Sequence, residues 1–264
     1  MLDQVTPVIL TFNEAPNIGR TLKQLSWAKD VVVIDSFSTD DTVAIVNRYS
    51  NARLFQRKFD SHAQQWNFGL KETEIDTDWV LALDADYVIS ENLMREIQSL
   101  APAVDLSGYR ASFRYCIGGC PLRATVYTPV TVLFRLARAF YAQDGHTQRV
   151  QVDGKIAALS GVIFHDDRKP LSRWVESQNR YMRLEAEKLL NAEWSNLSWA
   201  GRMRKLRVVA PFAMLVYCLF LRGLVLDGRA GLFYSFQRAF AELLLSLHLL
   251  QHDLSLSSGS KVVD

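Results

Sequence analysis

Short apolar, β-branched stretches that end in polar turns recur along the first hundred residues. Residues 5–12 and 30–35 each run into a polar turn, and further apolar stretches cover residues 52–56 and 79–84. Runs of this length and composition, bounded by polar residues, predict β-strands. We therefore expect four strands in the first third of the chain.

The segments between these strands have the pattern of helices. Asn13 can cap a helix that Pro16 helps to start, and helical patterns also cover residues 43–49 and 63–71. Regular alternation of strands and helices is typical of a parallel sheet that helices cover on both faces. The predicted fold class is therefore α/β with a mostly parallel central sheet.

Two carboxylates stand one residue apart where the strand over residues 79–84 should end. They are Asp84 and Asp86. Side chains two apart in an extended segment point to the same side, so the pair can converge on one divalent cation. An isolated pair of this kind is more often an ordinary acidic turn.

Polar residues after the first two strands favour the functional interpretation. In open parallel sheets, ligands bind outside the carboxyl ends of the strands. Side chains that follow different strands would therefore line one crevice. Besides the two carboxylates, the residues concerned are Thr11, Asn13, Glu14 and Asp35.

Three motifs of this region, in this order and at this spacing, resemble the nucleotide-sugar-binding half of the inverting glycosyltransferases of family 2. They are Thr-Phe-Asn-Glu at residues 11–14, Val-Ile-Asp-Ser-Phe-Ser-Thr-Asp-Asp-Thr at 33–42 and Leu-Asp-Ala-Asp at 83–86. Within the family, the chain is similar to bacterial lipopolysaccharide-core glycosyltransferases of the WaaE/KdtX type, over roughly residues 5–190. The resemblance implies the fold called GT-A, a nucleotide-sugar donor with a bias to uridine, and a divalent metal, Mg²⁺ or Mn²⁺.

The resemblance also implies roles for individual residues. Asp84 would lie near the ribose or phosphate, and Asp86 would be the metal ligand. From the residues alone, a carboxylate at Asp35 suits hydrogen bonds from a ribose or base. The residues implied to hold the nucleoside are Thr11, Asn13, Glu14 and Asp35.

The second hundred residues are less regular. Residues 108–136 alternate enough to predict strands that extend the sheet and build an acceptor wall. Cys116 and Cys120 lie in a turn between them, but the chain has three cysteines in all and no second pair completes a zinc site. We expect a structural role for them, because an unpaired Cys behaves as a small apolar residue.

The catalytic base is where the chain departs from the family. In similar enzymes a carboxylate that directly follows a His deprotonates the acceptor hydroxyl, whereas here His146 is followed by Thr147. Asp144 could serve instead, His146 could act with a near-neutral pKa, or the acceptor could be a phosphate that needs no base. An ordinary turn at Asp144 and a structural histidine are the competing interpretations.

A second charged cluster, at residues 165–169, follows the apolar run over residues 159–164. A solvated cluster of charges is one interpretation. In the functional one, His165 contacts a metal or phosphate, and Arg168 and Lys169 neutralise the departing diphosphate. The place of the cluster just after a predicted strand favours function.

The C-terminal part changes composition. An amphipathic helix is predicted over residues 171–191, and a basic stretch over 201–207 precedes an apolar run over 208–221. That run is shorter than the roughly 20 residues of a membrane span. We expect a re-entrant or interfacial helix with its basic residues on anionic head groups, followed by a second helix over 232–252. Packing of both helices on the catalytic domain is the alternative.

These patterns predict a domain organisation and a location. Residues 1–195 would form the catalytic domain, with nucleotide-sugar binding in 1–100 and the acceptor side in 101–195, and residues 196–264 would associate with a membrane surface. The first apolar run is a strand rather than a signal peptide, and few cysteines fit a reducing compartment. We expect the cytoplasmic face of the bacterial inner membrane, with peripheral or re-entrant attachment.

The sequence thus predicts a metal-dependent inverting transferase that moves a hexose from a nucleotide-diphosphate sugar to a lipid-linked or lipopolysaccharide-type acceptor. A net charge of +2 without a basic stripe argues against nucleic acid as a partner. The alternatives are a polyprenyl-phosphate glycosyltransferase and a catalytically inactive membrane-bound scaffold, which Thr147 motivates. A sugar-phosphate nucleotidyltransferase would need a glycine-rich basic loop, which residues 11–14 lack.

Overall fold

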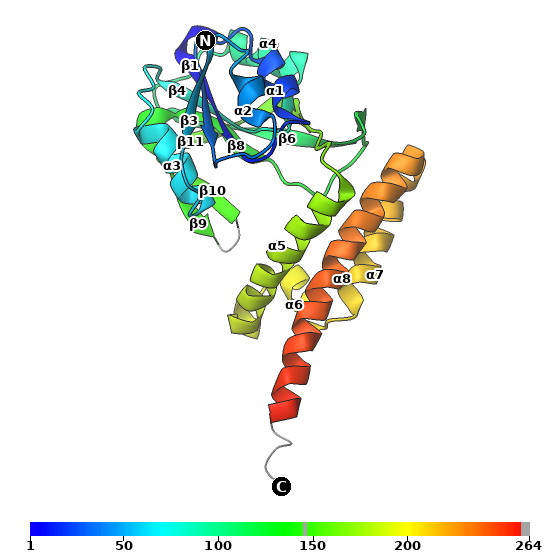
Figure 1. Ribbon diagram of the computed structural model, residues 1–264. Helices are drawn as coiled ribbons and strands as arrows, with labels where there is room; N and C mark the ends of the chain where they lie inside the picture. Colours follow the sequence, from blue (N-terminus) through cyan, green and yellow to red (C-terminus); the bar gives the residue numbers. More distant parts are fainter. Residues whose placement is uncertain (145–146, 260–264) are drawn as a thin grey trace. The chain divides into compact units, whose positions relative to one another are not determined.

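The computed structural model describes residues 1–144 and 147–259 of the chain. It divides into two compact units (Figure 1). The sheet unit comprises residues 1–121 and 125–169, and the helical unit comprises residues 122–124 and the chain from residue 170 onward. The boundary predicted at residue 195 separates a catalytic region from a membrane-associating region, and it stays a prediction.

The first half of the sheet unit has the predicted alternation of strands and helices. Four parallel strands lie in the order β3-β2-β1-β4, which places the first strand in the middle. Three helices connect them in chain order, as expected for parallel strands, which need crossover connections. The bounds are β1 Val5–Thr11, α1 Ile18–Gln24, β2 Val31–Asp35, α2 Thr42–Val46, β3 Ala52–Gln56, α3 His62–Lys71 and β4 Trp79–Asp84.

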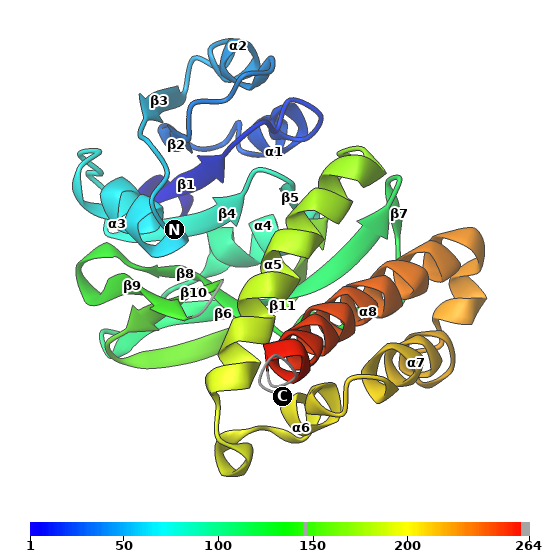
Figure 2. The ribbon, with the colours of Figure 1, turned by 60° about the horizontal axis from the view of Figure 1, so that its bottom comes forward.

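The second half of the sheet is mixed, so the expectation of a mostly parallel sheet is confirmed in part: the sheet as a whole is mixed and largely parallel. Beyond β4 the order continues β8-β6-β11-β5 (Figure 2). β6 and β11 pair in parallel, but β8 is antiparallel to both β4 and β6, and β5 is antiparallel to β11. No helix lies between β6 and β8 along the chain, which an antiparallel pair allows. The bounds are β5 Tyr87–Ile89, α4 Glu91–Ser99, β6 Leu106–Ile117, β8 Val130–Arg135 and β11 Lys155–His165.

Smaller elements complete the unit, and one of them was not predicted. β9 and β10 form a separate two-stranded antiparallel sheet. Asn67 of α3 fastens it, because its amide group donates to the carbonyl oxygen of Tyr141 and accepts from the Tyr141 backbone N–H. The bounds are η1 Leu2–Gln4, β7 Cys120–Pro121, η2 Leu136–Arg138, β9 Ala139–Asp144 and β10 Thr147–Val152.

Alternate residues of the central strands fill a core on each face of the sheet. Val5 and Ile9 of β1 pack with α1, α2 and α4, whereas Val8 of the same strand packs with α3. This is the two-residue period of a strand with both faces covered. At Gly69 of α3 a β-carbon would lie 2.2 Å from Ile34 of β2. Glycine at this position therefore lets helix and sheet approach closely.

The helical unit is built around one long helix, α8, that lies between α5 and α7 (Figure 2). One apolar core of the unit lies between α5 and α8, where Ala186 and Leu189 meet Leu245 and Leu249. The helix predicted over residues 171–191 is confirmed. The bounds are α5 Leu171–Asn191, η3 Trp194–Asn196, α6 Trp199–Lys205, α7 Val209–Val216, the π-helical segment η4 Tyr217–Leu221, η5 Leu224–Asp227 and α8 Gly228–Gly259.

The basic stretch at residues 201–207 does not form the free patch expected for anionic head groups. The Arg204 guanidinium binds both carboxylate oxygens of Glu242, and Arg207 pairs with Asp253 at 2.8 Å. The Lys205 ammonium donates to the carbonyl oxygen of Ala192. The sequence did not show this arrangement, because acidic residues some 40 positions later on α8 come alongside the stretch only when the helices pack.

Among the described residues, no single helix is both long and apolar enough to span a membrane. The helical runs Val209–Leu221 and Leu224–Ser255 reach that length and composition together, with a bend of 71° at the break between them.

Candidate functional site

The register of the parallel strands brings the predicted site residues to one edge of the sheet. Thr11 at the end of β1 lies beside Asp35 at the end of β2, and Leu10 lies beside Asp84 at the end of β4. The Thr11 hydroxyl is buried and has no hydrogen-bond partner among the described residues. A buried hydroxyl without a partner is costly, so this one suits a ligand at the carboxyl edge.

Asp84 and Asp86 meet through a turn rather than along an extended strand. Asp84 is the last residue of β4, residues 85 and 86 form the turn, and β5 begins at Tyr87. The turn is fastened to α1, because the Thr21 hydroxyl donates to the carbonyl oxygen of Ala85 at 2.7 Å. The two carboxylates therefore stand at a strand end and in a turn, and the charge of Asp86 is close enough to raise the pKa of Asp84. Their convergence on one cation stays a prediction.

His165 joins this pair because β5 and β11 are neighbours. The backbone of His165 pairs with that of Tyr87, directly after Asp86. Its Nε2 lies 3.1 Å from Oδ2 of Asp86, and its Nδ1 is buried without a partner among the described residues. The predicted metal ligands Asp86 and His165 are thus in contact, although 79 residues separate them.

The donor set fits a divalent ion that also binds substrate phosphates. The described residues contain no group of three or more His, Cys, Asp or Glu side chains placed to hold a metal. Mg²⁺ and similar ions in nucleotide sites often take only one or two carboxylates from the protein, and the rest of the shell comes from phosphates and water. Asp86, with His165 as a nitrogen donor, meets that requirement.

Crowded negative charge perturbs the acids of the crevice. Burial and the charge of Asp86 raise the pKa of Asp84 to about 6, and the same two causes raise the pKa of Glu14 to about 7. Burial alone would lower the pKa of His165, but the neighbouring Asp86 carboxylate raises this pKa above its usual value. Carboxylates that resist ionisation in each other's presence create a strong demand for a cation, which is common at functional sites.

Lys169 is placed to meet part of this demand. Its ammonium lies 2.5 Å from Oε1 of Glu14 and 3.7 Å from Asp167. It is also close enough to Asp84 and Asp86 to lower the pKa of both carboxyls. The predicted diphosphate contact therefore lies in the crevice, although carboxylates already surround it.

Arg168 lies differently from Lys169. Its guanidinium binds Asp166, at 2.9 Å, and is half exposed. Gly119 in the turn after β6 leaves room for it, because a β-carbon there would lie 2.9 Å from the guanidinium. Its part in neutralising the diphosphate stays a prediction.

The loops after β1 and β2 are joined by hydrogen bonds. Asn13, at a positive φ of 54°, accepts from the Thr39 backbone N–H at 2.7 Å, and its own N–H donates to Ser38. The Glu14 N–H donates to the Thr42 hydroxyl. Asn13 is therefore not the helix cap that we expected, since α1 begins at Ile18. Asn13 shapes the crevice instead.

Asp35 is fully buried, and its carboxylate already has partners. It accepts from the backbone N–H and hydroxyl of Ser38, and from the side-chain amide of Gln56 at 3.1 Å. These contacts hold the loop that follows β2. Direct contact of Asp35 with a nucleoside stays a prediction.

Sequence reasoning missed a hydrogen-bond network beneath the crevice. Asn17 is fully buried and binds Glu14 and Asp167 through its amide nitrogen and the Arg168 backbone N–H through its oxygen. Arg20, three residues further along α1, binds Asp166 at 2.6 Å. The network ties α1 to residues 166–169. Neither residue stands in a recognisable motif, so no signal in the sequence singled them out.

Tyrosines surround the His165 ring. The Tyr87 hydroxyl donates to Asp84, and its ring centroid lies 5.2 Å from that of His165. Tyr115 and Tyr127 lie 4.6 and 5.3 Å from the same ring. At the neighbouring strand ends, Phe12 and Phe37 are each about half exposed. Exposed aromatic faces near a nucleotide crevice can stack on a base.

The predicted base residues are only partly described by the structure. The backbone of Asp144 ends β9, and His146 lies outside the described residues. Tyr141, three residues before Asp144, is buried. Burial raises the pKa of the Tyr141 hydroxyl, and the nearby charge of Asp84 raises that pKa further. The strand that leads to Asp144 therefore passes near the crevice. Which group acts as the base stays a prediction.

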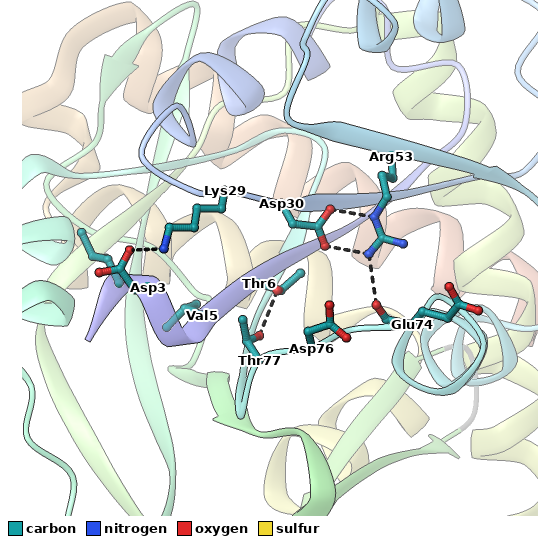
Figure 3. Close-up of a pocket in the computed structure, with 10 residues that line it drawn as sticks. Asp3, Val5, Thr6, Lys29, Asp30, Arg53, Glu74, Asp76 and Thr77 are labelled. Carbon is teal, nitrogen blue, oxygen red and sulfur yellow. Dashed lines mark hydrogen bonds and ion pairs between the residues drawn. The ribbon is translucent and has the colours of Figure 1, made fainter.

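A separate hollow of about 390 Å³ lies at the opposite, amino end of the parallel strands (Figure 3). The Arg53 guanidinium donates two hydrogen bonds of 2.7 Å to the Asp30 carboxylate there. It also donates to the carbonyl oxygen of Thr73. The side chain of Arg53 is thus engaged in joining β3 to the chain after α3. We assign the hollow no part in the site, because the strand-end residues lie at the other edge.

Comparison with known proteins agrees with this geometry. The model of glycosyl transferase family 2 matches residues 6–160. An uncharacterised glycosyltransferase of Rickettsia prowazekii is 26% identical over 285 aligned residues, which cover 99% of this chain and 91% of that protein. The lipopolysaccharide core biosynthesis glycosyltransferase LpsC of Rhizobium meliloti is 27% identical over 194 residues, which cover 68% of this chain and 69% of that protein.

A solved structure shares the fold. S. aureus TarS, in complex with UDP-GlcNAc, superimposes with a TM-score of 0.52 at 17% identity, over 89% of this chain and 90% of that one. Likeness at such low identity shows the fold alone, which is α/β and GT-A-like with C-terminal helices. The family match spans more than half of the chain, and the strand-end motifs lie inside it. The resemblance inferred from the sequence is confirmed: this chain belongs to glycosyltransferase family 2.

Proposed function

We propose that this protein is a metal-dependent, inverting glycosyltransferase that moves a hexose from a uridine diphosphate sugar to a lipid-linked or lipopolysaccharide-type acceptor. The observation that carries the proposal is the contact of Asp86 with His165 beside Asp84, at the carboxyl edge of the parallel strands. The relative LpsC, named for lipopolysaccharide core biosynthesis, supports the acceptor class. TarS, which binds UDP-GlcNAc, supports the donor class through the shared fold.

The residues of the crevice divide the chemistry between them. Asp86 and His165 would hold the divalent ion, whose positive charge stabilises the diphosphate as it leaves. Lys169 adds a positive charge from the protein on the same side. Thr11 and the loops joined by Asn13 would orient the nucleoside, which fixes the anomeric carbon before the acceptor.

Inversion requires one displacement on the face opposite the diphosphate. The acceptor oxygen bonds to the anomeric carbon, the bond to the diphosphate breaks, and a base takes the proton of the acceptor hydroxyl. Asp144 is our first choice for that base and His146 the second. Positioned bases contribute about a hundred- to ten-thousand-fold, so Asp144→Asn should lower turnover strongly with donor affinity nearly unchanged.

A polyprenyl phosphate is the second candidate acceptor, and Thr147 favours it. An already ionised phosphate needs no base, so the missing carboxylate after His146 would be harmless. Near-normal turnover of both Asp144→Asn and His146→Ala with the true acceptor would select this candidate. An inactive scaffold is disfavoured, because Asp84, Asp86 and His165 are all present and in register.

The direct test is release of nucleoside diphosphate from a panel of nucleotide sugars, with lipopolysaccharide core or polyprenyl phosphate as acceptor and with Mn²⁺, Mg²⁺ or chelator. We expect acceptor-dependent turnover that chelation removes. A thermal-shift screen of the same ligands identifies the donor, since a ligand that binds only the folded state stabilises it. Absence of any metal-dependent donor binding would reject the proposal.

The proposed location is the cytoplasmic face of the bacterial inner membrane, with peripheral or re-entrant attachment. The support is a surface that we call the α7 face, whose apolar side chains are 45–76% exposed. Arg222 and Arg229 flank it, and the chain from residue 170 onward carries 12 Lys and Arg against 8 Asp and Glu. Apolar area with nearby positive charge suits anionic lipid. The α7 face comprises Val209, Phe212, Val216, Phe220, Leu221 and Leu226.

A further inference from the structure

α8 carries a second apolar surface, which we call the α8 stripe. Its seven side chains are separated by alternating steps of three and four residues over three heptads, and each is 38–67% exposed. The stripe comprises Phe233, Phe236, Phe240, Leu243, Leu247, Leu250 and Leu254. A strict alternation of three and four is the pattern of a coiled-coil seam, which is narrower than the apolar face of an ordinary globular helix.

The stripe is not the surface that holds the helical unit together. The side chains of α8 that are buried against the other helices lie elsewhere on the helix and include Tyr234, Ala241, Leu245 and Leu249. At the margin of the stripe, the Phe240 ring also touches Trp174 of α5, with the ring centroids 6.2 Å apart. α8 therefore has one apolar face that is buried within its own unit and another that stays largely exposed.

The flanks of the stripe favour a protein partner over lipid. No Lys or Arg occurs from residue 239 to residue 259, and the polar side chains beside the stripe include Gln237 and Gln251. Helices that lie in a membrane interface are rich in Lys and Arg on their polar face. Such residues flank the α7 face but not this part of α8. The two apolar surfaces of the helical unit therefore differ in their chemistry.

The period and the area both fit a second copy of this chain. A seven-residue repeat drifts by about 20° per heptad on a straight helix, and two such helices that wind around each other keep their stripes in contact. Each half-exposed Leu or Phe offers on the order of 100 Å², so seven give about 700 Å² per copy. That is close to the roughly 800 Å² per partner of a standard interface.

We propose that the protein forms a homodimer in which the α8 stripe of one copy packs against the α8 stripe of the other. The same surface on both copies makes the contact isologous, which closes after two subunits. The helix positions beside the seam carry almost no charge, so charge pairs do not set the relative direction of the helices. The inference goes beyond the proposed reaction and does not depend on it.

The test is the mass of the full chain in detergent-free buffer, measured by sedimentation across micromolar concentrations. We expect twice the 30.0 kDa of one chain. Leu243→Glu combined with Leu250→Glu places like charges across the seam and should give a monomer. Leu243→Ala with Leu250→Ala should weaken dimerisation at least tenfold without added charge. Circular dichroism and donor binding report whether these variants remain folded.

The matched control lies on the other apolar surface. Phe212→Glu with Phe220→Glu changes residues that are 70% and 66% exposed on the α7 face and should leave the dimer intact. A monomeric wild-type chain, or a dimer that survives both stripe variants, overturns the proposal. So does a dimer that the control disrupts equally. Loss of binding to anionic vesicles by a stripe variant of a monomeric protein would assign the stripe to lipid instead.

Discussion

The crevice of the sheet unit and the packed helices of the helical unit differ in how their charges are arranged. In the sheet unit, Glu14, Asp84 and Asp86 share one crevice, and burial and the charge of Asp86 raise the pKa of the first two. In the helical unit, Arg204 binds Glu242 and Arg207 binds Asp253, so each charge has an opposite charge beside it. Like charges that crowd together favour the binding of a cation, whereas paired opposite charges stabilise the packing of the helices.

The two units also differ in how far they expose large apolar side chains. The sheet unit packs apolar residues into two cores, one on each face of its sheet. The helical unit leaves the α7 face and the α8 stripe exposed. Large exposed apolar surfaces indicate binding to a partner or a membrane. The proposed chemistry therefore depends on the charges of one unit, and the proposed contacts depend on the apolar surface of the other. Each of the following changes tests one side of this contrast.

The largest effect is expected for Asp86→Ala. It removes a carboxylate that lies 3.1 Å from His165 and should lower kcat/KM by about a thousandfold, with loss of metal-dependent donor binding and no loss of fold. Steady-state kinetics across Mn²⁺ concentrations give the measurement. Asp105→Ala is the control, because the Asp105 carboxylate lies in an exposed pair with Lys155. Wild-type turnover at limiting metal would remove Asp86 from the site.

Glu242→Ala should lower the free energy of unfolding and leave donor binding unchanged, the opposite of what is expected for Asp86→Ala. Glu242 is 2% exposed, and its loss leaves the Arg204 guanidinium with Glu185 at 3.4 Å as its remaining carboxylate. Breaking a buried pair in this way costs about 3 kcal/mol. The urea transition followed by helical circular dichroism should move to lower concentration. Glu187→Ala, an exposed change on α5, should not move it, and equal shifts for both would contradict the assignment.

The double variant Phe212→Glu with Phe220→Glu tests the exposed apolar surface of the helical unit. Both rings are more than half exposed on the α7 face, so charge there should weaken binding to anionic vesicles at least tenfold. Flotation of the full chain with vesicles measures this, and added salt should weaken the wild-type interaction further. Unchanged flotation would mean that this face does not meet lipid. Turnover with a water-soluble acceptor should stay as in the wild type.

The smallest effect concerns pH. With a pKa of about 7, Glu14 is mostly neutral at pH 6 and mostly ionised at pH 8. Ionisation adds a negative charge beside Asp86, so the Kd for Mn²⁺ without nucleotide should fall about five- to tenfold over this interval. Calorimetric titration of wild type and Glu14→Gln gives the comparison, and the variant should show a flatter profile. An equally steep profile in Glu14→Gln would assign the titration to another group.

Much of the fold could be predicted because its signals are local. The strand over residues 52–56 and the helix over residues 171–191 have the expected bounds. Strand ends in a parallel sheet meet at one edge, so the order of strands along the chain was enough to group Thr11, Asp35 and Asp84. The pair of strands β9 and β10 was missed, because β9 is held by Asn67 of a distant helix rather than marked by a strong pattern of its own.

The sequence by itself determined the family, the α/β class and the carboxylates of the crevice, since periodicity and motif spacing act over a few residues. Only the tertiary structure decided which distant groups meet. The pairing of β5 with β11 brings His165 to Asp86, and helix packing brings Glu242 to Arg204, a basic residue that looked free for lipid. Such contacts depend on sheet order and helix packing, which join residues dozens of positions apart and which no local pattern encodes.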